Sequence, residues 1–276
     1  MGFFEFLAGA LTWLAERLAH FPAWFESILL DLIAAALFSA LILVGPALRR
    51  ARLRRFLRLP GGEKFDVVCS AIAAESTSPF YRRPTTGYGE LLALANLLEL
   101  FTYIYRSSEK IDIIRLSAER HYPNYRLSNN IVTVGGASHN QVTRFFKNEL
   151  GARMVIQTID EPHEAPDRDY IYRDTRSGQE YRAERDGEGN LTLDYGLITK
   201  ARNPLNREHS VIYVGGLHTF GLAGSGVFLQ PLTLRKHFKQ LNALRDPEFQ
   251  ILLKVRVRGY DVFVDFMDYI KLEPSA

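Results

Sequence analysis

The sequence predicts an α/β protein in which one N-terminal transmembrane helix precedes a soluble domain with a mostly parallel sheet. Three observations lead to this fold class. A long apolar run lies near the N-terminus and is followed by a cluster of arginines. Beyond it, short runs rich in Val and Ile alternate with helical patterns. Two of these runs end in a glycine pair that leads into a helix, which is typical of strand-to-helix junctions in parallel sheets.

The apolar run covers residues 28–48 and is interrupted by one charge, Asp31. A bilayer core needs ~20 apolar residues, so this run is long enough to span it. The arginine run that follows consists of Arg49, Arg50, Arg52, Arg54, Arg55 and Arg58. Positive charge favours the cytoplasmic side, so the C-terminal part is predicted to be cytoplasmic. A cleavable signal peptide has the opposite order of charge and apolar run, so we interpret the segment as an anchor.

Residues 1–60 are therefore predicted to form a membrane module, with an amphipathic helix at 3–25, a transmembrane helix at 28–48 and a basic linker at 49–60. Apolar side chains recur at helical spacing in 3–25, but charges interrupt them. This pattern favours a helix lying in the outer interface, with Trp13 and Trp24 at headgroup level. A re-entrant or second spanning helix stays open as an alternative.

The segment Pro60-Gly61-Gly62 is a linker signal, and residues 61–276 are predicted to form the soluble domain. Strands are predicted at 65–73, 111–117, 130–134, 154–159 and 210–214, and helices at 89–105, 140–150, 223–229 and 232–244. Strands with continuous Val and Ile, each leading toward a helix, indicate a Rossmann-like, mostly parallel sheet. The polar stretch 161–190 predicts a β-hairpin insertion, and 249–258 with 261–270 predict a C-terminal β-hairpin.

Charge and cysteine content narrow the classes of function. The net charge of +3 arises mainly from the arginine run, so no nucleic-acid duplex is expected as a partner. Cys69 is the only cysteine, which excludes an internal disulfide and a cysteine-based zinc site and fits a reducing compartment. No metal site and no cofactor are predicted.

Ligands of open parallel sheets bind beyond the carboxyl ends of the strands, so three loops are candidate sites. In the first loop, glycines would let the backbone approach a ligand, and the following helix would offer free N–H groups to a phosphate or carboxylate. Its candidate ligand-binding residues are Gly135, Gly136, Ser138, Asn140 and Thr143. Ser138 or Asn140 is equally consistent with a plain helix N-cap.

The second loop repeats this pattern with more glycine, and its candidates are Gly215, Gly216, His218, Thr219 and Gly221. Two such junctions in one domain favour binding over packing alone. Neither junction contains the G-x-x-x-x-G-K-[ST] pattern of a P-loop NTPase.

The third loop leaves the first strand and offers hydroxyls and guanidinium groups for phosphates through Ser76, Thr77, Arg82 and Arg83. A solvated surface loop is the alternative interpretation. Tyr195, in the segment Asp194-Tyr195-Gly196-Leu197-Ile198, is a candidate cover for a bound base, although an aromatic beside a glycine in a strand is more often explained by simple packing.

Signatures of catalysis are sparse, because the sequence contains no H-E-x-x-H, G-x-S-x-G or Cys–His pattern. Glu75 and Glu90 are the carboxylates beside the first-strand loop. A hydrolase that cleaves a nucleotide at its glycosidic bond would have to use one of them. The sequence favours a binding protein over an enzyme.

The succession of a strand with Gly135-Gly136, Asn140 and Thr143, then D-Y-G-L-I, then a strand with G-G-L-H-T-F-G resembles a known group of domains. These are the Rossmann-like ligand sensors of bacterial antiphage and nucleotide-signalling systems, including CARF, SLOG and nucleoside-deoxyribosyltransferase-like modules. The resemblance covers roughly residues 66–229. The catalytic glutamate of the deoxyribosyltransferase-like enzymes is not found in its usual context, so the resemblance implies ligand binding rather than turnover.

With a transmembrane helix in front, the whole chain resembles the membrane effectors of CBASS and type III CRISPR systems. This resemblance implies a single-pass protein of the bacterial inner membrane that binds a cyclic or linear nucleotide in the cytosol. Binding would make the protein assemble as a homo-oligomer and disrupt the lipid bilayer. The alternatives are a membrane-tethered enzyme that hydrolyses a nucleotide or NAD, and an interaction protein without a ligand.

Overall fold

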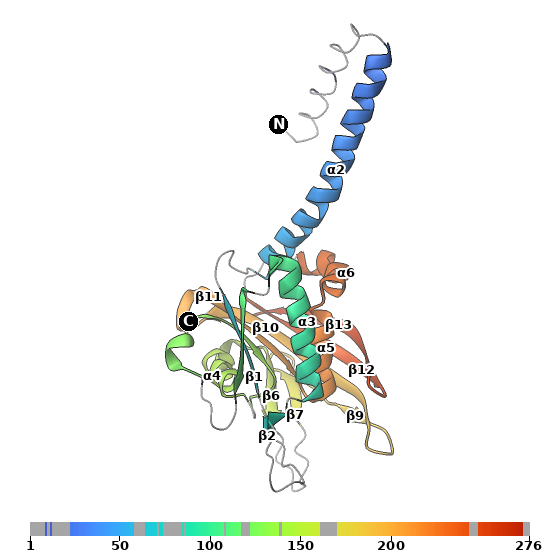
Figure 1. Ribbon diagram of the computed structural model, residues 1–276. Coiled ribbons are helices and arrows are strands. Elements are labelled where there is room, and N and C mark those ends of the chain that lie inside the picture. The colour runs from blue at the N-terminus through green and yellow to red at the C-terminus, as the bar shows by residue number, and fades with distance from the viewer. Residues whose placement is uncertain are drawn as a thin grey trace. The chain divides into compact units, whose positions relative to one another are not determined.

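The computed structural model describes residues 9, 12, 23–57, 64–70, 72–73, 84–85, 87–107, 109–116, 122–137, 140–160, 170–242 and 248–272. The chain divides into two compact units, Met1–Arg52 and Leu53–Ala276. The helix α2, Ala23–Phe56, crosses this division. Its residue Leu53, and Leu57 directly after the helix, belong to the hydrophobic core of the second unit. Figure 1 shows the elements of each unit.

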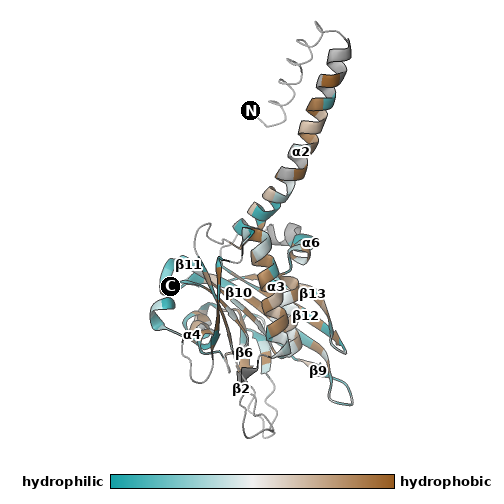
Figure 2. Ribbon diagram, viewed as in Figure 1, coloured by the Kyte–Doolittle hydropathy of each residue, from teal (hydrophilic) through white to brown (hydrophobic). Residues whose placement is uncertain are grey.

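Within α2, the segment Asp31–Arg54 is long and apolar enough to cross a membrane, and no residue of its most apolar part is buried within the protein. The predicted span 28–48 lies inside α2. Figure 2 shows the hydrophobic stretch of the helix giving way to hydrophilic residues toward its C-terminal end, where the arginine run begins. The amphipathic helix predicted at 3–25 falls almost entirely outside the described residues.

The second unit is built on a sheet of eight described strands. Seven of them form the order β13-β12-β10-β11-β5-β1-β4, and the short strand β9, Glu184–Arg185, pairs with β10. Their bounds are β1 Phe65–Ser70, β4 Ile111–Leu116, β5 Asn130–Val134, β10 Leu191–Asn203, β11 Asn206–Gly216, β12 Phe249–Arg258 and β13 Asp261–Lys271. The strands β4, β1, β5 and β11 run parallel, as the sequence predicted, while β11, β10, β12 and β13 pair antiparallel.

Helices cover both faces of this sheet. On one face the helices α3, Tyr88–Tyr105, and α5, Thr219–Phe228, pack against each other and against the sheet, and Leu234 of α6, Pro231–Asn242, joins the same core. On the other face α4, Gln141–Leu150, packs Val142 and Phe146 against β1, β5 and β11. The 3₁₀ turns η1, Asn124–Arg126, and η2, Gly151–Arg153, connect elements. The predicted helices are therefore present, with shifted ends.

One predicted strand of the main sheet lies elsewhere. Residues 154–159 were expected in the parallel sheet, but β6, Ile156–Asp160, pairs antiparallel with β7, Tyr170–Asp174, which pairs with β8, Glu180–Tyr181. The fully buried Gln250 explains this placement, because its Oε1 accepts the N–H groups of Val155 and Ile156, each at 2.8 Å. The side chain of Gln250, in β12 of the main sheet, thus contacts β6, and among the described strands no backbone pairing between β6 and the main sheet is involved. Residues 161–169 of the predicted insertion lie outside the described residues.

The amino ends of the parallel strands are fixed by a buried carboxylate, Asp66 of β1. Its oxygens accept hydrogen bonds from the Tyr122 hydroxyl at 2.6 Å, the Arg126 Nε at 3.0 Å and the Asn129 amide at 3.1 Å. Burying a carboxylate is costly unless its lone pairs are satisfied, and here they are. This end of the sheet is closed by structural contacts, so the opposite, carboxyl end is the place to look for a ligand.

The short strands β2, Ile72–Ala73, and β3, Pro84–Thr85, pair antiparallel beyond β1.

Candidate functional site

The carboxyl ends of β1 and β5 bring together three residues that are far apart in the sequence. Ser70 is the last residue of β1, and Gly135 follows β5, which pairs with β1 in register up to Cys69 and Val134. Glu90 belongs to the first turn of α3. Its Oε1 accepts a short hydrogen bond from the Ser70 hydroxyl.

Glu90 is a buried carboxyl group with unused hydrogen-bonding capacity. The residue is 7% exposed, and its Oε2 has no partner among the described residues. Burial raises the pKa of Glu90 above its usual range, and hydrogen bonds from Ser70 and from the Gly87 backbone offset part of this shift. Buried polar atoms in folded proteins are nearly always satisfied. An orphaned carboxyl oxygen at the end of a parallel strand is therefore a candidate ligand contact.

Gly135 lets the carboxyl group of Glu90 approach the backbone. Its φ of +99° lies in the left-handed region, and a Cβ at this position would collide with Glu90 Oε1. The Gly135 N–H donates to the Val214 carbonyl at 3.0 Å, and its carbonyl accepts the Thr143 hydroxyl at 3.2 Å. The predicted candidate Gly135 thus lies at the site, and Thr143 supports it from α4.

Asn140, another predicted ligand contact, is the N-cap of α4. Its Oδ1 accepts the N–H groups of Val142 at 3.0 Å and Thr143 at 3.1 Å, while its Nδ2 donates to the carbonyls of Val68 and Val134. An amide side chain has two acceptor lone pairs and two donors, and all four are used here. We therefore assign Asn140 to the scaffold that joins α4 to β1 and β5, which is the N-cap interpretation left open by the sequence.

The start of α5 is occupied by a carboxylate of the same chain, Asp194 of β10. Its Oδ2 accepts the Gly221 N–H at 2.5 Å, and its Oδ1 accepts those of Tyr195 at 2.8 Å and His218 at 3.3 Å. Asp194 is fully buried, and burial is the main reason that its pKa is raised. A helix N-terminus attracts one anion, and Asp194 already fills that place. A carboxylate of the chain itself therefore lies at the junction where the sequence suggested a phosphate.

The glycines of the second loop serve close packing. A Cβ on Gly216 would collide with the backbone of Gly221 and Leu222, and a Cβ on Gly221 would collide with the Tyr195 carbonyl. Gly215 leaves room for the Tyr213 ring in the same way. This loop therefore places α5 directly against β10 and β11, and packing explains its glycine content without a ligand.

The remaining candidates of the two loops, Thr219, His218 and Gly136, contact other parts of the chain. The Thr219 Oγ1 accepts the Gly89 N–H at 3.0 Å, which joins the start of α5 to the start of α3 beside Glu90. His218, the N-cap of α5, is half-buried and uses its backbone N–H on Asp194. The remaining residue of the first loop, Gly136, accepts the Asn140 N–H at 3.1 Å.

Tyr195 lies in the core rather than over a ligand. Its ring packs against Tyr181 with ring centroids 5.5 Å apart, and the residue is 8% exposed. Packing is thus the interpretation that the structure favours. Ser76, Thr77, Arg82, Arg83, Ser138 and Glu75 lie outside the described residues. Within the described part of the chain, no group of three or more His, Cys, Asp or Glu side chains is arranged to hold a metal ion.

No protein-family model and no curated protein sequence matches this chain.

Sequence reasoning missed two residues that shape the site. Ser70 was included in a predicted strand without a role, although a serine that ends a Val-rich strand is an available signal. Asp194 was noted only as part of a motif. Its role as an internal anion depends on β10 lying beside α5, and the sequence shows no sign of that tertiary contact.

Proposed function

We propose that this chain is a membrane-anchored effector whose Rossmann-like domain binds a nucleotide at the carboxyl ends of β1 and β5. In this proposal the single-pass helix α2 anchors the protein in a bacterial inner membrane with the soluble domain in the cytoplasm. A cyclic or linear nucleotide drives homo-oligomerisation, and the assembled membrane helices disrupt the bilayer in antiphage defence. The three parallel strand pairs, the covering helices and the apolar α2 support this architecture.

The observation that carries the proposal is the orphaned Oε2 of Glu90. Hydrogen bonds that involve a carboxyl group are worth more than those between neutral amides, and a site that leaves one unmade has a reserved place for a donor or acceptor. The hydroxyl groups of a nucleotide sugar suit this place. Ser70 and Gly135 hold the other side of the carboxyl group, so its orientation is fixed before a ligand arrives.

The first test measures binding. The full-length protein in detergent is screened by thermal shift against cyclic and linear nucleotides, where a ligand at 100 times its Kd stabilises by about 2.7 kcal/mol. For a nucleotide that binds, Glu90→Gln should weaken Kd by roughly 2- to 10-fold, because one hydrogen bond contributes about 0.5–1.5 kcal/mol. Glu99→Gln, at an exposed position of the same helix, is the matched control and should leave Kd unchanged. No shift with any nucleotide would refute the proposal and favour a ligand-free interaction protein.

The second test measures the effect on membranes. Protein reconstituted in dye-loaded liposomes should release the dye when the bound nucleotide is added, and Glu90→Gln should require more nucleotide for the same leakage. If dye release is the same with and without each nucleotide that the soluble domain binds, the protein is a nucleotide-binding protein but not a membrane-disrupting effector.

The same carboxyl group favours a second candidate function, a hydrolase of N-glycosidic bonds. A carboxyl group with a raised pKa and a free oxygen is suited to act on the anomeric carbon or leaving base of a nucleotide. Incubating the protein with NAD and nucleotides and measuring free base by chromatography separates the two functions. Release of base that Glu90→Gln abolishes and Glu99→Gln preserves would establish the enzyme, whereas recovery of intact ligand supports the sensor.

A further inference from the structure

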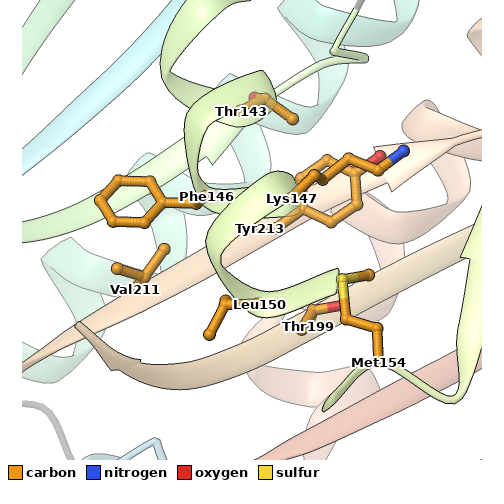
Figure 3. A pocket seen from close by; sticks show the side chains of 8 residues that line it. All are labelled: Thr143, Phe146, Lys147, Leu150, Met154, Thr199, Val211 and Tyr213. Carbon is orange, nitrogen blue, oxygen red and sulfur yellow. The ribbon is translucent and has the colours of Figure 1, made fainter. Parts of the chain in front are cut away.

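A second feature of the domain lies on the opposite face of the sheet, beneath α4. Lys147 of α4 lies beside a small cavity whose walls are mainly apolar, formed by Phe146, Leu150, Met154 and Val211. Figure 3 shows the Lys147 side chain extending past the Tyr213 ring. Lysines usually extend their ammonium group into water. Here the amine remains against the protein.

The surroundings of this amine do not neutralise its charge. Among the described residues, Lys147 Nζ has one hydrogen-bond partner, the Thr158 hydroxyl of β6 at 2.8 Å. Tyr213 is the other titratable side chain that lines the cavity, and burial raises its pKa to about 12, so it stays neutral. The described salt bridges do not include Lys147. A buried ammonium group without a carboxylate partner loses its hydration, and no opposite charge compensates for that loss, so its charged form is disfavoured.

Burial therefore lowers the pKa of Lys147 to about 8 from its ordinary 10.5. At pH 8 about half of these amines are neutral, compared with about one in 300 for a lysine of ordinary pKa. Only the neutral amine is a nucleophile. The fold thus provides a lysine that is half-buried, still partly exposed and ready to react at near-neutral pH.

We propose that Lys147 is a site of covalent modification by small activated acyl groups, acyl phosphates or acyl thioesters. The neutral amine attacks the acyl carbon, a C–N bond forms, and the bond from that carbon to the phosphate oxygen or thioester sulfur breaks. The leaving group departs with the bonding electron pair, and the amine proton passes to water. The product is an uncharged amide that keeps one N–H for the Thr158 hydroxyl, so the modification removes the desolvated charge without breaking the contact.

The expected selectivity follows from two opposing effects. At pH 8 the larger neutral fraction favours Lys147 over an ordinary lysine by about two orders of magnitude. Nucleophilicity falls with pKa, with a Brønsted slope of about 0.4–0.5 for thiols, and a similar slope removes roughly one order of magnitude. The acylation rate at Lys147 is therefore expected to be about tenfold higher than at an exposed lysine.

The experiment uses the full-length protein and two acyl donors, acetyl phosphate and acetyl coenzyme A, in separate arms. Peptide mass spectrometry measures the initial acetylation rates of Lys147 and of Lys236, an exposed residue of α6, between pH 7 and pH 10. The rate at Lys147 should exceed that at Lys236 about tenfold at pH 8 and should level off above that pH. Rates that are equal, or that rise in parallel to pH 10, in both arms would overturn the proposal. A difference in one arm alone identifies the acyl donor.

Discussion

At residue 90 the fold buries a carboxyl group in surroundings that favour its neutral form. In the unfolded chain Glu90 titrates near its ordinary value of 4.5, and in the folded chain its pKa is higher. Between these two values the folded state binds more protons than the unfolded state. The free energy of unfolding should therefore fall as pH rises from about 4.5 through the folded-state pKa.

The pH dependence of the free energy of unfolding should therefore differ between the parent protein and the variant Glu90→Gln. Glu90→Gln has no charge to bury, so it should lose less stability than the parent as pH rises through this window. Denaturant unfolding at a series of pH values measures the difference. Glu99→Gln removes an exposed carboxyl group from the same helix and should follow the parent. Parallel curves for the parent and Glu90→Gln would show that burial does not perturb this group.

At the scale of one element, α5 depends on Asp194 for its first turn. The residue comes from β10, not from α5, and accepts two backbone N–H groups at the helix start, those of His218 and Gly221, as well as the N–H of Tyr195, the next residue in its own strand. Asp194→Ala leaves these buried donors unsatisfied, at about 1–3 kcal/mol each, so a loss of about 3 kcal/mol or more in the free energy of unfolding is expected. Asp194→Asn keeps one acceptor oxygen and should lose less.

The control for this prediction is Asp268, which accepts the N–H of the next residue, Tyr269, at 2.8 Å but is exposed. Asp268→Ala should change stability by less than about 0.5 kcal/mol, as is usual for surface positions. Chemical denaturation of the three variants and the parent provides the comparison. A small effect of Asp194→Ala would mean that the start of α5 does not depend on the carboxylate.

Sequence patterns identify elements well where the hydrophobic pattern is simple and poorly where tertiary contacts satisfy polar groups. The strands β1, β4, β5 and β11 were predicted because Val and Ile dominate them. The long central strand β10 was not predicted as a strand, since Asp194, Thr199 and Lys200 interrupt its apolar pattern although all three are buried. Thr199, for example, accepts a hydrogen bond from Gln250 at 3.3 Å. Such partners are not visible along the chain.

In the candidate site, too, some features could be predicted from the sequence and others depend on tertiary contacts. Gly135 and Thr143 were predicted as ligand contacts, and Glu90 only as one of two catalytic candidates for an enzyme, and the three residues lie together in the structure. The two helix starts were predicted as anion sites, but the chain fills them itself, one with the Asn140 amide and one with the Asp194 carboxylate. A helix N-terminus in a sequence shows that donors exist, and only the fold shows whether they are already used.

At the scale of the whole molecule, the arginine run is predicted to fix the orientation of the chain in the membrane. Each arginine near an anionic lipid surface contributes about 1 kcal/mol, and the charge difference across the span sets topology. Changing the entire arginine run to Ser should give mixed insertion, while one or two changes should have little effect. A reporter fused after Ala276 should be cytoplasmic in the parent. An extracytoplasmic signal in the parent would contradict both the topology and the proposed cytosolic sensing.

The contacts of Gly216 and Gly221 have a consequence for evolution. Neither position has room for a single methyl group, so no other amino acid can stand there without moving α5 from the sheet. Divergent descendants of this chain should keep these two glycines even after their ligand has changed or been lost. Shared glycines in this loop would then mark common ancestry of the scaffold, whereas the residue at position 90 would record whether the activity was inherited with it.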